Sequence, residues 1–413
     1  MRIGILTYHG VPNFGAQLQT LSTVCYLRNA GHDPLVLNWS PQDLENMYKW
    51  IDIAQRKAHD EYASRYLPMS YMCRNEVELL EEIDRLQLDA ILLGSDALFK
   101  YIPILKRCYL KMGKRRPRII FVKVPSVERL HDNPFFGSFI PKMKKQVPVS
   151  VYAVSSQNAH FDLMTLLEKR LMKSYMSSFQ FISVRDEWTK KMVETITGVA
   201  NVDVYPDPVF AFNENVSSYI PTEKEIREKF NISGRYMLLS FRTGECTDEY
   251  IQSIAREVHD AGCQPIALAM PEGVYCGGIK PEISIPLSPM DWYALIKYSS
   301  GYIGERMHPI VVALHNAVPC FAFDEYGSTM PERVIFPRIG KWDKEKSKIY
   351  HIMHAAGGDA NWYAYGSKEP LPLPSYVVDR VVKCDKQKSL DFAQKQTERY
   401  NEGMKKILLS FMK

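Results

Sequence analysis

The chain has 413 residues, of which 46% are hydrophobic, 12% aromatic and 24% charged. This length exceeds what one hydrophobic core usually supports, so we expect two domains, and the composition is typical of a globular protein rather than a disordered or fibrous one. The formal net charge of +5 suits an anionic substrate or an anionic surface, and it does not by itself indicate nucleic acid as a partner.

The eight cysteines are scattered singly and form no C-x-x-C pair, so the sequence indicates neither a zinc knuckle nor a disulfide framework. We expect no metal site and no cofactor. The chain enters a strand-like run at once, MRIGILTYHG, without a signal peptide, and it has no apolar run long enough to span a bilayer. Together with the isolated thiols, this predicts a cytoplasmic protein.

Short aliphatic runs alternate with helical patterns along the first half of the chain. The expected strands are RIGILTY, PLVLNW, DAILLGSD, VSVYAVSS, FISVRD and VDVYPDP. The expected helices are residues 17–29, ELLEEIDRLQ, LMTLLEKRLMKSYM and EWTKKMVETITG. Buried strands joined by helical crossovers predict a parallel sheet that is covered on both faces.

Residues 101–130 interrupt this alternation. Lys and Arg are dense between Lys106 and Lys123, and no acidic residue lies between them. The simpler interpretation is a solvated insertion. The alternative is that 106–123 makes a peripheral contact with the inner membrane surface, through anionic lipid headgroups or a lipid-linked phosphate.

The alternation restarts after a polar stretch that contains one helical pattern, TEKEIREKF. Further strands are expected at YMLLSF, CQPIALAM, GYIGER and VPCFAF, with helices between them. We therefore predict an α/β fold with two Rossmann-like, doubly wound domains that face each other across a cleft. The predicted domains are residues 1–212 and 236–375, with a linker at 213–235. Residues 376–413 form a helical segment, whose long helix at roughly 390–412 packs back on the first domain.

Polar residues follow several predicted strands, at the sheet edge where ligands bind in open α/β folds. His9, Asn13 and Gly15 lie in the turn from the first strand into a helix. The free N–H groups of such a turn suit an anion. A tight strand-to-helix turn explains the same residues equally well.

Other strand ends carry further candidates. Asp96 is either a helix cap or a general base for a hydroxyl group. Ser155 and Ser156 either bind sugar hydroxyls or belong to a solvated loop. Arg185 emerges at the sheet edge, with a salt bridge to a nearby carboxylate as the alternative, whereas Asp207, flanked by two prolines, is read as a structural turn.

The stretch GERMHP places Arg306, Met307 and His308 at the end of a strand in the second domain. Pro309 suits the first turn of a helix, so His308 is expected at or next to the N-cap, where the helix dipole favours neutral imidazole unless an anion lies beside it. The Arg306 guanidinium matches a carboxylate or a phosphate. We predict that these residues and Arg185 clamp a small polyanion across the cleft.

Five stretches together resemble the polysaccharide pyruvyl transferase family. They are GILTYHGVPNFGAQLQTLSTVCYLRNAGHD, ILLGSD, ISVRDE, YPDPVF and IGERMHPIVVALHNAVP. The resemblance implies a GT-B-like fold and transfer of the enolpyruvyl unit of phosphoenolpyruvate to two hydroxyls of one sugar. The acceptor would be a cell-surface polysaccharide or its lipid-linked precursor, and the products a cyclic pyruvate ketal and phosphate.

The resemblance also implies that Arg185, Arg306 and His308 hold phosphoenolpyruvate, the donor substrate. We hypothesise that His308 is the general acid and Asp96 the base. The chain departs from the common family pattern at residues 97–100, which read Ala-Leu-Phe-Lys in place of Gln-Val-Trp-Asn, and in the 101–130 insertion. Both departures lie on the expected acceptor side. Two alternatives remain open, a GT-B nucleotide-sugar glycosyltransferase and a non-catalytic protein that binds a glycan or a lipid carrier.

Overall fold

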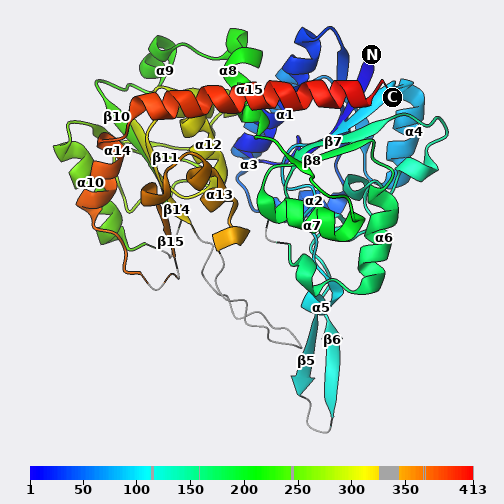
Figure 1. Cartoon of the computed structure of the whole chain (residues 1–413). Coiled ribbons are helices and arrows are strands. Elements are labelled where there is room, and N and C mark those ends of the chain that lie inside the picture. The colour runs from blue at the N-terminus through cyan, green and yellow to red at the C-terminus, as the bar shows by residue number, and fades with distance from the viewer. Residues whose placement is uncertain are drawn as a thin grey trace.

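Two parallel β-sheets, each covered by helices, form the body of the protein (Figure 1). The computed structural model describes residues 1–112, 116–157, 159–242, 246–324, 344–365, 367 and 369–412. The predicted α/β fold with two Rossmann-like domains is confirmed by the topology of these sheets. The bounds predicted for the domains and the linker stay predictions.

The first sheet has seven strands in the order β3-β2-β1-β4-β7-β8-β9, all paired in parallel. The strands are β1 (Arg2–Leu6), β2 (Asp33–Trp39), β3 (Met69–Cys73), β4 (Ala90–Leu93), β7 (Val149–Val154), β8 (Phe181–Val184) and β9 (Asp203–Val204). The helices are α1 (Phe14–Asn29), α2 (Gln42–Met47), α3 (Ile53–Tyr66), α4 (Glu76–Leu86), α6 (Leu166–Met176) and α7 (Glu187–Thr197). The sequence analysis did not predict β3, because this edge strand leaves most of its side chains partly or fully exposed and has no aliphatic run.

The second sheet has six strands in the order β12-β11-β10-β13-β14-β15. The strands are β10 (Tyr236–Ser240), β11 (Gln264–Leu268), β12 (Glu282–Ile283), β13 (Gly301–Gly304), β14 (Cys320–Asp324) and β15 (Trp362–Ala364). The helices of this half are α10 (Asp248–Asp260), α11 (Pro289–Lys297), α12 (Met307–His315), α13 (Lys348–Ala355) and α14 (Pro374–Val382). Two short helices precede the sheet, α8 (Phe212–Asn215) and α9 (Glu223–Lys229), and α9 is the helix predicted at TEKEIREKF.

The basic insertion contains a short helix, α5 (Ile104–Arg107), and an antiparallel hairpin of β5 (Cys108–Met112) and β6 (Pro117–Phe121). Figure 1 shows the hairpin extending away from the body, beyond α5. Residues 113–115 of the predicted basic run lie outside the described residues.

The last helix, α15 (Lys386–Ser410), runs across both halves of the molecule (Figure 1). It begins about four residues before the predicted start, because the Asp385 carboxylate caps its first turn. Its buried face includes Met404, and the Ser410 hydroxyl lies 2.7 Å from that of Ser150 on β7. A Cβ atom at Gly403 would press against the rings of two tyrosines of the first domain. The predicted return of the final helix to the first domain is confirmed.

Apolar packing joins the two halves. Phe14 at the start of α1 stacks on Trp292 of α11 with ring centroids 4.9 Å apart, and one continuous buried core includes residues of both sheets. The Gln55 side chain adds two hydrogen bonds to the Leu287 backbone, at 2.9 and 2.7 Å. No helix in the described part of the chain combines the length and the apolar character that a membrane span requires.

Shortening a buried side chain of α15 tests the contribution of this helix to the fold. Met404→Ala should lower the free energy of unfolding by about 2–5 kcal/mol, because the side chain is fully buried. Leu409→Ala on the same helix is the matched control and should change it by less than about 0.5 kcal/mol, because Leu409 is 57% exposed. Urea unfolding followed by tryptophan fluorescence measures both values, and equal values would contradict the packing of α15.

Candidate functional site

The candidate site lies at the carboxyl ends of β4, β7 and β8, where α12 of the second domain meets α1 of the first. Five side chains form its centre: Gln19, Asp96, Arg185, Asp207 and His308. Four of them follow strands or lie on α1 in the first domain, and His308 comes from the second. The carboxyl edge of parallel strands is where this class of sheet places ligand-binding groups.

Arg185 is buried among carboxylates. Its Nη1 donates a hydrogen bond to Oδ2 of Asp207 at 2.7 Å, and its Nη2 lies 3.9 Å from Oδ1 of Asp96. The side chain is 3% exposed, and its Nε and Nη2 have no hydrogen-bond partner within the described residues. A buried guanidinium with unused donors is suited to a ligand carboxylate or phosphate.

Asp207 connects Arg185 to the other domain. The Gln19 amide donates to Oδ2 of Asp207 at 2.5 Å and lies 3.4 Å from Nε2 of His308. Asp207 also accepts from the Val209 N–H at 3.0 Å and so caps the short turn that follows. Asp207 therefore has the structural role in a turn that the sequence predicted, and its carboxylate also belongs to the candidate site.

His308 packs directly on α1. A Cβ atom at Gly15 would overlap the imidazole ring, so residue 15 has to be glycine for the two helices to meet this closely. Helix α12 begins at Met307 with Arg306 as its N-cap, so His308 is the second helical residue and lies slightly farther from the cap than the sequence suggested.

Burial lowers the pKa of His308 to about 4. The carboxylates of Asp96 and Asp207 act in the opposite direction, and the positive charges of Lys348 and Arg185 lower the pKa further. The free protein therefore holds His308 as neutral imidazole at neutral pH.

Asp96 stays ionised despite its burial. Burial pushes the pKa of its carboxyl group upward, but the protonated form of His308, together with Arg185, Lys348 and the Ala97 N–H, holds it below the ordinary value. Its backbone has a φ of 91°, a conformation that costs energy for a non-glycine residue. No helix follows it directly, so the alternative role of a helix cap does not apply.

Lys348, in the stretch KEKSK, was not selected from the sequence. Ser347 caps α13 and donates a hydrogen bond to Asp324 at the end of β14, which fixes the position of the next residue. Burial lowers the pKa of Lys348 to about 8, and Arg185 lowers it while Asp96 raises it. Within the described part of the chain, its ammonium group has no ion-pair partner.

A second lysine lies nearby. Burial lowers the pKa of Lys100 to about 7, with further lowering by the charges of Arg129 and Lys348 and an opposing effect of Asp96. Lys100 thus adds a second titratable amine to the surroundings of Asp96.

Four predicted binding residues have their polar groups engaged by the protein. Both ring nitrogens of buried His9 face protein oxygens, at 3.0 Å from Thr7 and 2.9 Å from Asn38. Ser155 donates to Asp186 at 2.7 Å, and the hydroxyl of Ser156 lies 3.0 Å from that of Thr189. Asn13 accepts from the Ala16 N–H at 3.2 Å and caps α1.

Arg306 and Met307 do not join the central cluster. Arg306 forms an ion pair with Glu272, which follows β11, and its side chain is 32% exposed. Its φ of 83° is, like that of Asp96, in the region that favours glycine. Met307 is buried in the core. The predicted binding roles of these residues stay predictions.

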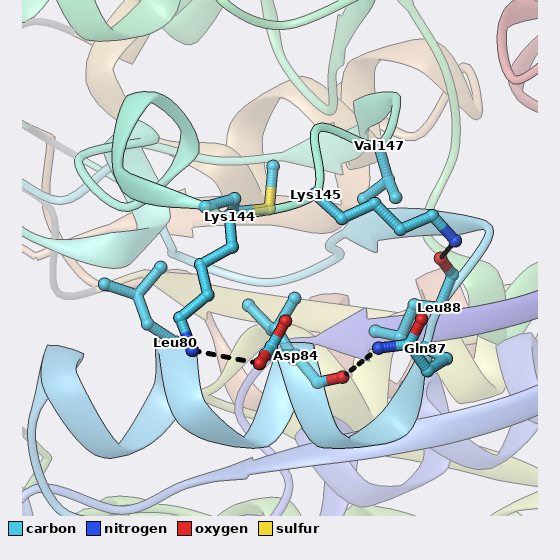
Figure 2. Close-up of a pocket in the computed structure, with 9 residues that line it drawn as sticks. Leu80, Asp84, Gln87, Leu88, Lys144, Lys145 and Val147 are labelled. Carbon is cyan, nitrogen blue, oxygen red and sulfur yellow. Dashed lines mark hydrogen bonds and ion pairs between the residues drawn. The ribbon is translucent and has the colours of Figure 1, made fainter.

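A pocket between α4 and residues 143–147 lies at the amino ends of the strands of the first sheet, opposite the candidate site (Figure 2). Its polar groups bind one another: Lys144 pairs with Asp84 at 3.1 Å, and Lys145 donates to the Leu88 carbonyl at 3.4 Å. Because it adjoins the amino ends of β4 and β7, it is separate from the candidate site. Across the described residues, no three His, Cys, Asp or Glu side chains are grouped to hold a metal ion.

Two Rossmann-like domains with a charged site at their junction define a GT-B-like architecture. The sequence pattern of the family described as polysaccharide pyruvyl transferase matches residues 13–325, well over half of the chain. The protein therefore belongs to the polysaccharide pyruvyl transferase family, and this membership implies that it is a transferase. Among curated proteins, none matches the sequence significantly.

The solved structures that resemble this chain share little sequence identity with it. The spinosyn forosaminyltransferase SpnP is 11% identical, with a TM-score of 0.48 over 98% of this chain and 95% of that one. The UDP-GlcNAc 2-epimerase from Methanocaldococcus jannaschii is 10% identical, with a TM-score of 0.49 over 94% of each chain. LpCGTa, solved in complex with UDP, is 10% identical, with a TM-score of 0.47 over 99% of each chain.

A methyl group at position 15 tests the contact between α1 and His308. Gly15→Ala should lower the free energy of unfolding by about 1–3 kcal/mol, because the imidazole would have to move. Gly10→Ala is the matched control, since nothing lies within 4 Å of a Cβ atom there. Urea unfolding compares the two variants, and an equally small effect would contradict the contact.

The pH dependence of stability tests the neutral state of His308. The pKa of His308 in the folded protein, about 4, is below its ordinary value of 6.5, so the unfolded chain binds the proton first as the pH falls. The stability linked to this group is complete above pH 6.5 and is lost between pH 6.5 and 4. His308→Gln should therefore flatten the slope of unfolding free energy against pH in this window.

Urea unfolding at pH 7, 6 and 5 measures that slope. His259→Gln is the control, because the His259 side chain is 80% exposed. A slope that His308→Gln leaves as steep as in the unchanged protein would argue against a buried neutral imidazole.

Proposed function

We propose that this protein transfers the enolpyruvyl unit of phosphoenolpyruvate to two hydroxyls of one sugar in a cell-surface polysaccharide or its lipid-linked precursor. The observation that carries the proposal is the meeting of His308 from one domain with Arg185 and Asp96 from the other. Membership of the polysaccharide pyruvyl transferase family supports it.

The donor is a small trianion with a carboxylate and a phosphate. Arg185 offers two nitrogens that make no hydrogen bond within the described residues, and Lys348 offers an ammonium group close to it. These groups suit the two anionic ends of phosphoenolpyruvate. Arg306 would have to leave its ion pair with Glu272 in order to contact phosphoenolpyruvate.

The bound phosphate would change the state of His308. Negative charge beside the imidazole raises its pKa from the low value of the free protein. The imidazolium then gives its proton to the methylene carbon, and the first sugar hydroxyl attacks the adjacent carbon as its own proton passes to a base. The C–O bond to phosphate then breaks and leaves an oxocarbenium-like carbon. The second hydroxyl attacks this carbon as its proton passes to the departing phosphate, and the ketal and phosphate leave.

Asp96 is our candidate for the base. Its carboxylate is ionised and near both His308 and Arg185, as the role requires. Its lowered pKa makes it a weak acceptor in the free protein. The binding of a trianion that neutralises the surrounding cations would raise that pKa and strengthen the base.

Calorimetric titration with phosphoenolpyruvate, UDP and GDP tests the donor. We expect phosphoenolpyruvate to bind and the nucleotides not to bind. Lys348→Met should weaken binding about 10- to 150-fold, because a charge-assisted hydrogen bond is lost. Lys344→Met is the matched control on an exposed lysine four residues away and should leave the affinity unchanged.

Arg306→Ala in the same titration tests the second arginine. A nucleotide that binds in place of phosphoenolpyruvate would overturn the proposed chemistry and favour a nucleotide-sugar glycosyltransferase. Lack of binding by all three ligands would favour a non-catalytic role.

A further inference from the structure

The β5–β6 hairpin exposes apolar side chains on an element that stands away from the body (Figure 1). Ile119, Phe121 and Val122 are 60%, 64% and 52% exposed, and Ile104 and Leu105 at its base are each more than one-third exposed. Apolar groups gathered in this way on a projecting element mark an interaction surface.

The same hairpin is strongly basic. Arg116, Arg118 and Lys123 are exposed beside the apolar side chains, and no acidic residue lies between residues 101 and 127. An anionic bilayer supplies phosphate groups for the basic side chains and hydrocarbon for the apolar ones. A nucleic acid would use the charges and leave Ile119 and Val122 in water.

The base of the hairpin is fixed to the first domain. The Tyr101 hydroxyl and the Ile104 N–H both donate to Oε1 of Glu168 on α6, at 2.5 and 2.8 Å. The Ile102 N–H donates to the Arg129 carbonyl at 3.1 Å, which ties the two ends of the insertion together. Contact at the hairpin would therefore orient the whole first domain, and Lys100 beside the candidate site directly precedes this base.

We propose that the β5–β6 hairpin is a docking arm that binds the surface of an anionic lipid bilayer, with its basic residues on the headgroups and Ile119, Phe121 and Val122 inserted at the acyl boundary. The hairpin lies outside the candidate site, so its binding to a bilayer does not depend on which donor the enzyme uses.

Co-sedimentation of the full chain with phosphatidylcholine vesicles, alone or with one-quarter phosphatidylglycerol, tests the arm. We expect binding to the anionic vesicles only, weakened by high salt. Arg116→Gln combined with Arg118→Gln should weaken the binding about 30-fold, as two basic contacts are lost. Ile119→Ser combined with Phe121→Ser should also weaken it, at least tenfold.

Matched controls carry the same kinds of change elsewhere. They are Lys57→Gln with Lys224→Gln, whose side chains are 76% and 84% exposed, and Leu166→Ser, where the residue is 77% exposed. Controls should bind vesicles as the unchanged chain does. Phosphoenolpyruvate titration of the hairpin variants should be unaffected, which separates this proposal from the proposed catalytic function.

Several results would overturn the proposal. They are equal binding to neutral and anionic vesicles, no binding to either, or hairpin variants that bind like the controls. Self-association lost in the Ile119→Ser, Phe121→Ser variant, measured by light scattering without vesicles, would identify a second copy of the chain as the occupant. Binding to a single-stranded oligonucleotide but not to vesicles would identify nucleic acid.

Discussion

The ion pair between Arg185 and Asp207 is the constraint on which the site depends. A guanidinium is costly to bury without a partner, and Asp207 supplies one at 2.7 Å from within a turn bounded by two prolines. The same carboxylate accepts the Gln19 amide, and Gln19 reaches His308. One buried charge pair thus fixes a strand end, the first helix and the contact with the second domain.

The contact between the domains is close enough to bury His308 and to set its protonation state. Gly15 allows the imidazole of His308 to lie against α1, and burial keeps that imidazole neutral in the free protein. Both Asp96 and Arg306 have backbone angles that cost energy. Strained residues beside a buried titratable group are a combination that is common at functional sites.

The strand ends allowed three of the central residues to be selected from the sequence. Asp96, Arg185 and His308 each follow a strand or open a helix, and the carboxyl edge of a parallel sheet brings such residues together. His9, Ser155 and Ser156 follow strands in the same way, yet their polar groups bind neighbouring parts of the protein. A position at a strand end says nothing about which partner a side chain meets.

The sequence by itself determined the α/β class, the two doubly wound domains and the presence of the long final helix, because hydrophobic periodicity reports local structure and burial. It also determined the family, through motifs spread over most of the chain. Only the tertiary structure decided that Lys348 and Gln19 belong to the site, that Arg306 pairs with Glu272 and that the basic run is a projecting hairpin. These features depend on contacts between residues far apart in the chain, and local sequence patterns carry no record of such contacts.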